Sequence, residues 1–192
     1  CYLGAFITHL IGSGLVTSSV ALLLQETVGQ GVRVGSWTLG IATISGFVFS
    51  SHWLSAIFLS SWSGALSDRY GRLVPFVVVT ALQGSLLFVL AYVWHPWVSV
   101  AAAILFFVAT NMQKVFLDAA LGDTTDLEDR HTVTARYNSY QDLGAALGPL
   151  LGYGASIVSG FRVIYVVGAV MLLFVTVVPI SNLFRSAEKS AL

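Results

Sequence analysis

Long apolar runs separated by short polar segments extend along the whole chain. Six such runs can be read from the sequence, at residues 3–24, 36–62, 73–94, 98–121, 134–158 and 163–184. About 20 residues of α-helix, at a rise of 1.5 Å per residue, span the hydrocarbon core of a bilayer. Each run is long enough to do so. The pattern therefore predicts an all-α, polytopic membrane protein, with a single bundle of six transmembrane helices over residues 1–192.

The composition agrees with this pattern. Hydrophobic residues make up 56% of the chain and charged residues only 9%, with a mean hydropathy of +0.84. Soluble domains carry about a quarter charged residues, so this chain has too few to cover itself in water. Its formal net charge of zero gives no basic field that would attract nucleic acid. The single cysteine, Cys1, excludes a disulfide within the chain.

The distribution of basic residues predicts an orientation. Six runs make three hairpins, so both ends should lie on one side of the membrane. Residues on that side include Arg69, Arg72, Arg130, Arg136, Arg185 and Lys189, against Arg33 and Arg162 on the other. Because cytoplasmic loops carry the excess of Lys and Arg, we expect an integral protein of the cell membrane with both termini in the cytoplasm.

The most polar short tract between two long runs is residues 64–72, Gly-Ala-Leu-Ser-Asp-Arg-Tyr-Gly-Arg. We expect a tight turn here, bracketed by Gly64 and Gly71, because glycine suits tight turns and close backbone approach. Asp68 offers a carboxylate that could cap the N-terminus of a neighbouring helix. Arg69 and Arg72 supply the positive charge of a cytoplasmic loop. An ordinary short cytoplasmic turn is the alternative interpretation.

The fifth run carries a second pattern, Asp-Leu-Gly-Ala-Ala-Leu-Gly-Pro-Leu-Leu-Gly over residues 142–152. Gly144, Gly148 and Gly152 repeat at one-turn spacing, which favours packing against another helix over contact with lipid. Pro149 removes a backbone hydrogen bond and is expected to bend the helix, making a pivot. Leucine at Gly148 should force the helices apart, whereas alanine there should be partly tolerated. Generic close packing would explain the glycines alone.

Together these two tracts resemble a known family. Residues 64–72 resemble the signature loop of the major facilitator superfamily, and residues 142–152, starting at Asp142, resemble its fifth-helix motif and the eleventh-helix counterpart. That family has twelve helices in two similar halves, so the chain looks like a fragment or one six-helix half of a larger transporter. The Asp-Leu-Gly start of the fifth run looks more like the C-terminal half. The resemblance also implies that Asp68 docks on the fifth helix near residues 134–136.

The chain departs from the family after Arg72. Leu73, Val74 and Pro75 follow it, where the family often has further basic residues. Fewer cations are therefore left to pair with the acidic segment at residues 122–131.

The function that the resemblance implies is secondary active transport of a small solute by alternating access, with two halves rocking about a site at the midplane. Its partners would be a small-molecule substrate, the lipid bilayer and the other six-helix half. The alternative class is a non-transporting polytopic protein, either a structural partner or an enzyme acting on lipid. The sequence has no phosphate-binding loop, metal-ligand spacing or nucleophile elbow, so we predict no enzyme, cofactor or metal.

Charged residues within the apolar runs are candidate functional groups, because an unpaired charge in the membrane costs about 3 kcal/mol or more. Lys114 and Asp118 are four residues apart in the fourth run and could form a local ion pair. Lys114 could instead reach Asp142 in the fifth run, or bind an anionic substrate. Asp142 needs a partner or water, and could carry a proton.

Three further polar residues could line a cavity or hold the helices together. His9 and His52 fit structural hydrogen bonding better than a proton relay. Asn111 lies deep in the fourth run, where it could contact substrate or form an interhelical hydrogen bond.

Overall fold

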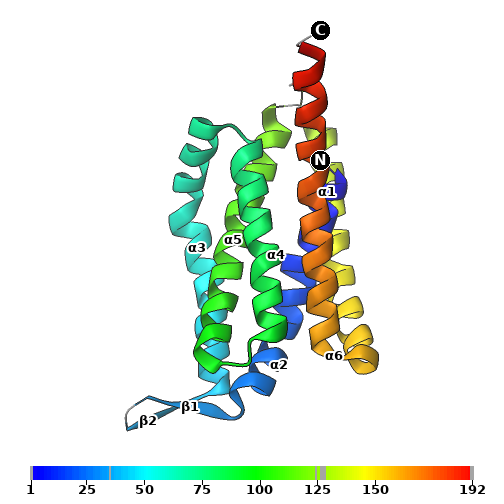
Figure 1. Ribbon diagram of the computed structural model, residues 1–192. Helices are drawn as coiled ribbons and strands as arrows, with labels where there is room; N and C mark the ends of the chain where they lie inside the picture. The colour runs from blue at the N-terminus through cyan, green and yellow to red at the C-terminus, as the bar shows by residue number, and fades with distance from the viewer. Residues whose placement is uncertain (1, 35, 124, 126–128, 191–192) are drawn as a thin grey trace.

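The computed structural model describes residues 2–34, 36–123, 125 and 129–190, with residues 33, 34, 37 and 178–190 given by their backbone alone. Long helices stand side by side, and a small β-hairpin projects from one end (Figure 1). In the described part, five helical segments are long and apolar enough to cross a membrane. The membrane class is therefore confirmed, whereas the predicted count of six spanning helices is not shown.

The first span is a single rod made of α1 (Tyr2–His9), η1 (Leu10–Val16) and α2 (Thr17–Val28). The central piece, η1, is a π-helix, a wider and rare form that α-helices contain mostly as a single turn. The rod runs longer than the predicted 3–24, because Gln25 and Glu26 stay helical until Gly29, at φ 72°, ends it.

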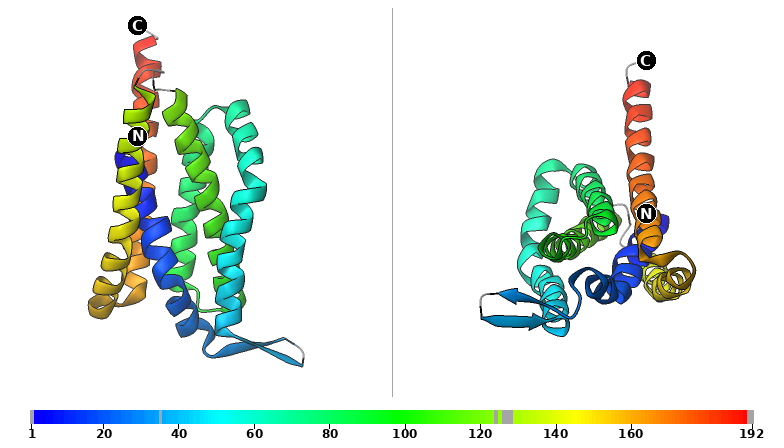
Figure 2. Two further views of the ribbon diagram at one scale, coloured as in Figure 1. Left: turned by 180° about the vertical axis from the view of Figure 1, so that it is seen from behind. Right: turned by 60° about the horizontal axis from the view of Figure 1, so that its bottom comes forward.

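A β-hairpin follows, and the sequence pattern missed it. Strand β1 (Gly31–Val34) pairs antiparallel with β2 (Trp37–Gly40), with Gly31 opposite Gly40. Figure 2 shows the hairpin reaching outward from the helices. A Cβ at Gly31 would lie 2.5 Å from the Leu39 carbonyl oxygen, so the pairing requires glycine there. The predicted start of the second helix at residue 36 is therefore wrong, because α-helix begins only at Ile41.

The next two helices are α3 (Ile41–Tyr70) and α4 (Leu73–Tyr92). The chain reverses between them at Gly71, whose φ of 79° is a conformation that glycine adopts without strain. Gly64 lies inside α3, which continues through most of the polar tract 64–72. The prediction of a turn bracketed by both glycines is thus wrong, and the reversal is confined to Gly71 and Arg72.

The last two helices are α5 (Pro96–Asp123) and α6 (Arg130–Ser190). Proline suits the first turn of α5, where its missing N–H is not needed. In α6 the backbone is non-helical at Gly160 (φ 76°, ψ 161°), and the two arms on either side run antiparallel (Figure 1). The expected reversal near residues 160–162 is present, but the helical segments on its two sides are counted together as one of the five candidate spans.

Pro149 lies in helical backbone, since Gly160 is the non-helical residue within α6.

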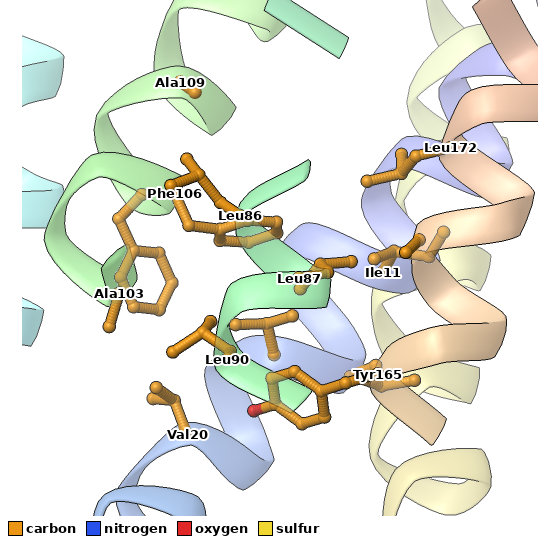
Figure 3. Packing of buried hydrophobic residues seen from close by; sticks show 14 of the residues in the cluster. Ile11, Val20, Leu86, Leu87, Leu90, Ala103, Phe106, Ala109, Tyr165 and Leu172 are labelled. Atoms are coloured by element: carbon orange, nitrogen blue, oxygen red, sulfur yellow. The ribbon is translucent and has the colours of Figure 1, made fainter. Parts of the chain in front are cut away.

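A continuous apolar core joins the first span, α4, α5 and α6. Ile11, Leu87, Phe106 and Leu172 are at most 1% exposed and converge from these four elements (Figure 3). Tyr165 is also fully buried, and its hydroxyl lies 3.0 Å from the Ser19 hydroxyl. This core fixes the relative positions of the helices that carry the candidate site.

Helix α3 is packed differently from the others. In the most apolar 18-residue stretch of α3, 17% of the residues are buried, against 67% in that of the first span. Its exposed face carries Trp53, Ile57, Phe58 and Trp62. One long side of α3 is thus available to lipid or to another protein segment.

The first and last described residues, Tyr2 and Ser190, lie toward the end of the bundle that holds the α3–α4 reversal, whereas the β-hairpin and the Gly160 reversal lie at the other (Figures 1 and 2). This arrangement agrees with the expectation that both ends share one side. Which side faces the cytoplasm stays a prediction.

Candidate functional site

A cavity of about 580 Å³ lies among the first span, α3, α5 and the first arm of α6. Each helix contributes polar side chains to its wall, although all four are apolar enough to span a membrane. Polar groups that are this costly to place in a membrane generally face a bundle interior or a water-filled space. The polar and charged residues in the wall are Thr8, His9, Ser13, Thr17, His52, Ser60, Thr110, Asn111, Gln113, Lys114, Asp118, Gln141 and Asp142.

Asn111 holds α5 against α3 at the edge of this cavity. Its Nδ2 donates to the His52 carbonyl oxygen at 2.5 Å and to the Ser55 hydroxyl at 2.7 Å. These bonds use both hydrogens of the amide, and Nδ2 also lies 3.4 Å from the His52 ring Nδ1. Of the two interpretations of Asn111, the interhelical hydrogen bond is the one formed in this conformation.

The wall of the same cavity holds three charged side chains, those of Lys114, Asp118 and Asp142. Within the described residues, the two ion pairs formed both involve Arg72. The expected Lys114–Asp118 pair and the alternative Lys114–Asp142 pair are therefore not formed in this conformation. All three charged side chains are exposed to the cavity or its mouth, which leaves them available to water or a solute.

A second cavity of about 390 Å³ continues from the first toward the start of α6. The two share Lys114, Asp118 and Gln141 as a common wall. Tyr137 Oη and Gln141 Nε2 are buried beside this wall without a hydrogen bond of standard geometry among the described residues, although the side chains of Asp118 and Gln141 lie close enough to the Tyr137 hydroxyl to interact with it. Buried groups of this kind are commonly satisfied by water.

The two candidate histidines lie on this cavity in different settings. His9 Nδ1 is 3.0 Å from the Ala5 carbonyl oxygen of its own helix. The His52 ring packs edge-on against Phe107, with ring centroids 5.0 Å apart. Both contacts fit the structural interpretation, and neither histidine is ion-paired within the described residues.

The glycines of α6 form a very close crossing with the first span. A Cβ at Gly144 would lie 2.5 Å from the Phe6 carbonyl oxygen, and one at Gly148 would lie 2.5 Å from both the Leu10 carbonyl oxygen and the Leu15 nitrogen. At Gly152 the nearest atom would be 3.7 Å away. The expectation that alanine at Gly148 is partly tolerated conflicts with this geometry, because backbone atoms occupy the space that a methyl group needs.

Buried amides connect α4 to α5 beside the cavity, and sequence reasoning did not single them out. Gln83 Nε2 donates to Thr110 Oγ1 at 2.9 Å, and Gln113 Nε2 donates to Thr80 Oγ1 at 2.6 Å. Each helix thus supplies one glutamine and one threonine, and all four side chains are buried. The available signal was the presence of Gln83 and Gln113 in otherwise apolar runs, where an amide needs a partner.

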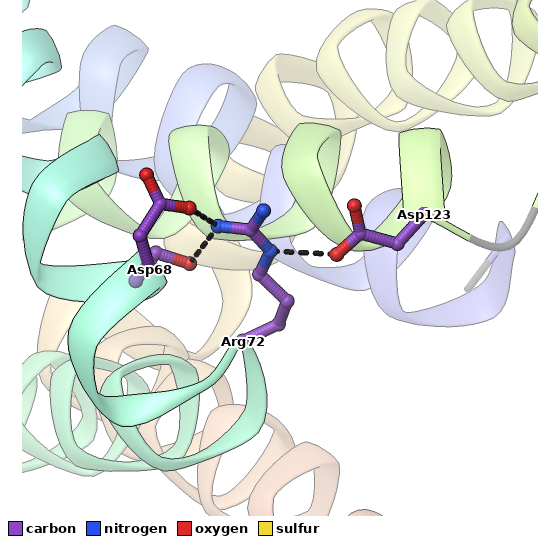
Figure 4. A network of polar contacts seen from close by, with 4 residues as sticks. Asp68, Arg72 and Asp123 are labelled. Carbon is purple, nitrogen blue, oxygen red and sulfur yellow. Dashed lines mark hydrogen bonds and ion pairs between the residues drawn. The ribbon is translucent and has the colours of Figure 1, made fainter.

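Arg72 connects the α3–α4 reversal to the end of α5 (Figure 4). Its Nε donates to Asp123 Oδ2 at 2.7 Å, and its Nη1 donates to Asp68 Oδ1 at 2.5 Å and to Ser67 Oγ at 3.1 Å. The hydrogen bonds to Asp123 and then to Asp68 raise the pKa of the Arg72 guanidinium above its usual range. Asp123 was not among the candidate residues, although it lies in the acidic segment.

Asp68 does not occupy its expected place in this conformation. The described residues show no hydrogen bond or ion pair between Asp68 and residues 134–136; its carboxylate instead accepts from Arg72, one turn along the chain. Arg69 is exposed and lies over the Tyr70 ring, 5.4 Å from its centroid. Part of the acidic segment, residues 124 and 126–128, lies outside the described residues.

The sequence profile described as Major Facilitator Superfamily matches residues 1–191. The chain belongs to the Major Facilitator Superfamily. Members of this superfamily are typically non-enzymatic membrane transporters.

Curated relatives within the superfamily carry the name multidrug resistance protein MdtG. The chain is 31% identical to the protein from Dickeya zeae, over 85% of this chain and 39% of that protein. It is 26% identical to the protein from Escherichia fergusonii, over 99% of this chain and 46% of that protein. A third, from Salmonella arizonae, is 27% identical over 90% of this chain and 42% of that protein. The chain thus spans less than half the length of these relatives.

Proposed function

We propose that the chain forms one six-helix half of a secondary transporter that moves a small solute across the cell membrane by alternating access. Six crossings follow if each arm of α6 spans the bilayer separately. The stretch Arg130–Val177 of α6 alone has 48 residues, about twice what one crossing needs. The reversal at Gly160 supports two crossings.

The observation that carries this proposal is the cavity with polar and charged side chains in its wall that lies among four membrane-spanning elements. Substrate sites of such transporters lie near the midplane, at the interface of the repeats. A second six-helix half would complete the cavity, and the exposed apolar face of α3, with Trp53 and Phe58, offers a surface for it. The Asp-Leu-Gly sequence at residues 142–144 supports the C-terminal half as the part represented here.

The substrate class that we propose is small organic molecules. The curated relatives are named for multidrug resistance, and the cavity wall combines the aromatic rings of Phe49 and Trp53 with the charges of Lys114, Asp118 and Asp142. Apolar walls with a few polar groups suit small organic ligands.

The Arg72 contacts fit a role in alternating access. They join the start of α4 to the ends of α3 and α5 at the end of the bundle that we place in the cytoplasm. These bonds would hold the helices together in one state and break in the other. Differential contacts of this kind are what any two-state switch requires.

A flux assay tests the function directly. The protein as its gene encodes it is reconstituted in liposomes, and uptake of cationic, neutral and anionic fluorescent dyes is measured with and without an imposed proton gradient. We expect transport of at least one dye class, with the Lys114→Met variant altering the preference between anionic and cationic dyes. Val158→Met is the matched control, because Val158 is 87% exposed and lies outside the cavity wall.

The absence of flux for every dye class, from correctly inserted protein, would favour the non-transporting alternative. Equal dye preference for Lys114→Met and the parent protein would show that the cavity wall does not contact the solute.

A further inference from the structure

The π-helix η1 lies at the middle of the first span. Thr17, the residue that follows it, forms hydrogen bonds that hold its last turn. The backbone N–H of Thr17 donates to the carbonyl oxygens of Gly12 and Gly14, and its hydroxyl donates to the Gly12 carbonyl oxygen at 2.9 Å. Gly12, the acceptor of both groups, is five residues back, as in a π-helix, and not four, as in an α-helix. The Thr17 hydroxyl therefore stabilises the wide form of this turn.

A π-helical turn stores one residue more than the α-helix it interrupts. If η1 became α-helical with α2 held in place, that residue would be released toward the N-terminus. Each residue of α1 would then turn by about 100° and advance by about 1.5 Å, the increments per residue of an α-helix. Leu10 would take the place that His9 now has.

The side chains on either side of η1 make this rotation consequential. Thr8 and His9 precede η1 and line the cavity, whereas Leu10 is 5% exposed and lies outside its wall. A one-residue shift would put the apolar side chain of Leu10 where the imidazole of His9 now lies, and His9 where Thr8, which is 3% exposed, now lies. The composition of the cavity thus depends on the form of η1.

The surface against which η1 packs permits such a movement. Gly144 and Gly148 of α6 meet the backbone of the first span at Phe6, Leu10 and Gly14. Glycines present no side chains that would interlock with a turning helix. Backbone therefore meets backbone at this contact, without interlocking side chains. This lowers the resistance to rotation of α1 about its axis.

We propose that η1 is a register switch of the transporter, which converts between π- and α-helix and thereby brings Leu10 into the place of His9 in the wall of the 580 Å³ cavity and moves His9 into the buried place of Thr8. This inference rests on the proposed function for its purpose, but the conversion itself is a structural property that can be measured without transport.

Thiol labelling tests the conversion. In a background with Cys1→Ser, single cysteines are placed at His9 (H9C) or Leu10 (L10C), and the rate of reaction with the water-soluble 2-sulfonatoethyl methanethiosulfonate is measured in membranes. We expect fast labelling of H9C and slow labelling of L10C. Thr17→Val, which removes the hydroxyl and nearly keeps the shape, should raise the L10C-to-H9C rate ratio about 2- to 10-fold, the size expected for one hydrogen bond.

Ser18→Ala is the matched control. It also removes a hydroxyl bonded to a helix carbonyl, that of Leu15 at 3.0 Å, but over the three-residue separation of an ordinary helical turn. It should leave the rate ratio unchanged. Deleting Ser13 removes the spare residue, so the flanking helices keep their registers without a π-turn. In that background Thr17→Val should no longer alter the ratio.

The proposal is overturned if Thr17→Val leaves both rates unchanged or moves both in the same direction, which would indicate general loosening. It is also overturned if the effect persists after Ser13 is deleted. If the Ser13 deletion prevents membrane insertion, the proposal is decided by the L10C-to-H9C rate ratio alone, compared between Thr17→Val and Ser18→Ala. Labelling that shifts as expected in a protein without dye flux would retain the switch and reject the transport function.

Discussion

Gly148 is the residue at which a single added carbon would separate two helices. A Cβ there would lie 2.5 Å from the Leu10 carbonyl oxygen and the Leu15 nitrogen, and neither backbone atom can move as a side chain can. We expect Gly148→Ala to destabilise the protein by about 1–3 kcal/mol or more, the usual range for overpacking a close contact. The shift of the thermal midpoint in detergent, followed by size-exclusion chromatography, measures this effect.

Gly152→Ala is the control on the same helix face. A methyl group there would meet Leu15 Cγ at 3.7 Å, which is ordinary van der Waals contact. Its midpoint should stay near that of the parent protein, or rise slightly because alanine favours helix over glycine. Equal midpoints for the two alanine variants would contradict the close crossing at Gly148.

Arg72 is the second residue whose contacts lead to a prediction, because it forms ion pairs with both Asp68 and Asp123. Its partners Asp68 and Asp123 are exposed, and exposed ion pairs contribute little to stability. We therefore expect Arg72→Ala to leave the thermal midpoint nearly unchanged while it alters dye flux, because the bonds discriminate between conformations. Arg69→Ala, which removes an exposed arginine that forms no ion pair with the described residues, should alter neither. A flux effect of the same size in both variants would indicate loop charge alone.

At the scale of elements, the buried amides make α4 and α5 one unit. Interhelical hydrogen bonds within membranes contribute about 0.6 kcal/mol on average and up to about 1.7. We expect Gln113→Leu and Thr80→Val each to destabilise the protein within that range. The double variant should cost less than the sum, since both changes remove the same 2.6 Å bond. A double-mutant cycle on the thermal midpoint measures the coupling, and strict additivity would show that the bond contributes nothing.

The helices were predictable because run length in a membrane protein directly reports a crossing. Residues 73–94 became α4 at Leu73–Tyr92, and the reversal near Gly160 was expected where it lies. The hairpin at Gly31–Gly40 was missed because its strands are short and glycine-rich, so pairing and not periodicity defines them. The helical state of Gly64 was missed because polar residues at a membrane surface fit a helix end as well as a turn.

The candidate site was predictable only as a set of residue types. Lys114, Asp118, Asp142, His9 and Asn111 were recognised as costly in apolar runs, and the structure brings all five to one cavity. Their pairing was not predictable, because contacts between helices depend on rotations that a single sequence does not define. The π-turn at Leu10–Val16 has no sequence signal beyond Gly12, Gly14 and Thr17, which ordinary α-helices also tolerate.

At the scale of the whole molecule, different interactions connect the helices at the two ends of the bundle. At one end, the exposed ion pairs of Arg72 connect three helix ends. At the other, Arg162 donates to the Ala91 carbonyl oxygen at 3.2 Å and lies over the rings of Tyr92 and Trp94. The first end depends on bonds that water can replace, whereas the second combines a helix-end hydrogen bond with aromatic contacts. The bundle is thus better suited to open at the Arg72 end while the Arg162 end stays joined.

The orientation of these ends in the membrane is the last prediction. The excess of Lys and Arg at the Arg72 end places that end in the cytoplasm. Single cysteines replacing Arg69 and Ser159, both exposed, in a Cys1→Ser background report the two ends; Ser67 is unsuitable because it is 1% exposed and bonded to Arg72. An impermeant thiol reagent should label the Ser159 variant in intact cells, and the Arg69 variant only after permeabilisation. A permeant reagent should label both. Labelling of the Arg69 variant alone in intact cells would invert the topology and place the Arg72 contacts outside.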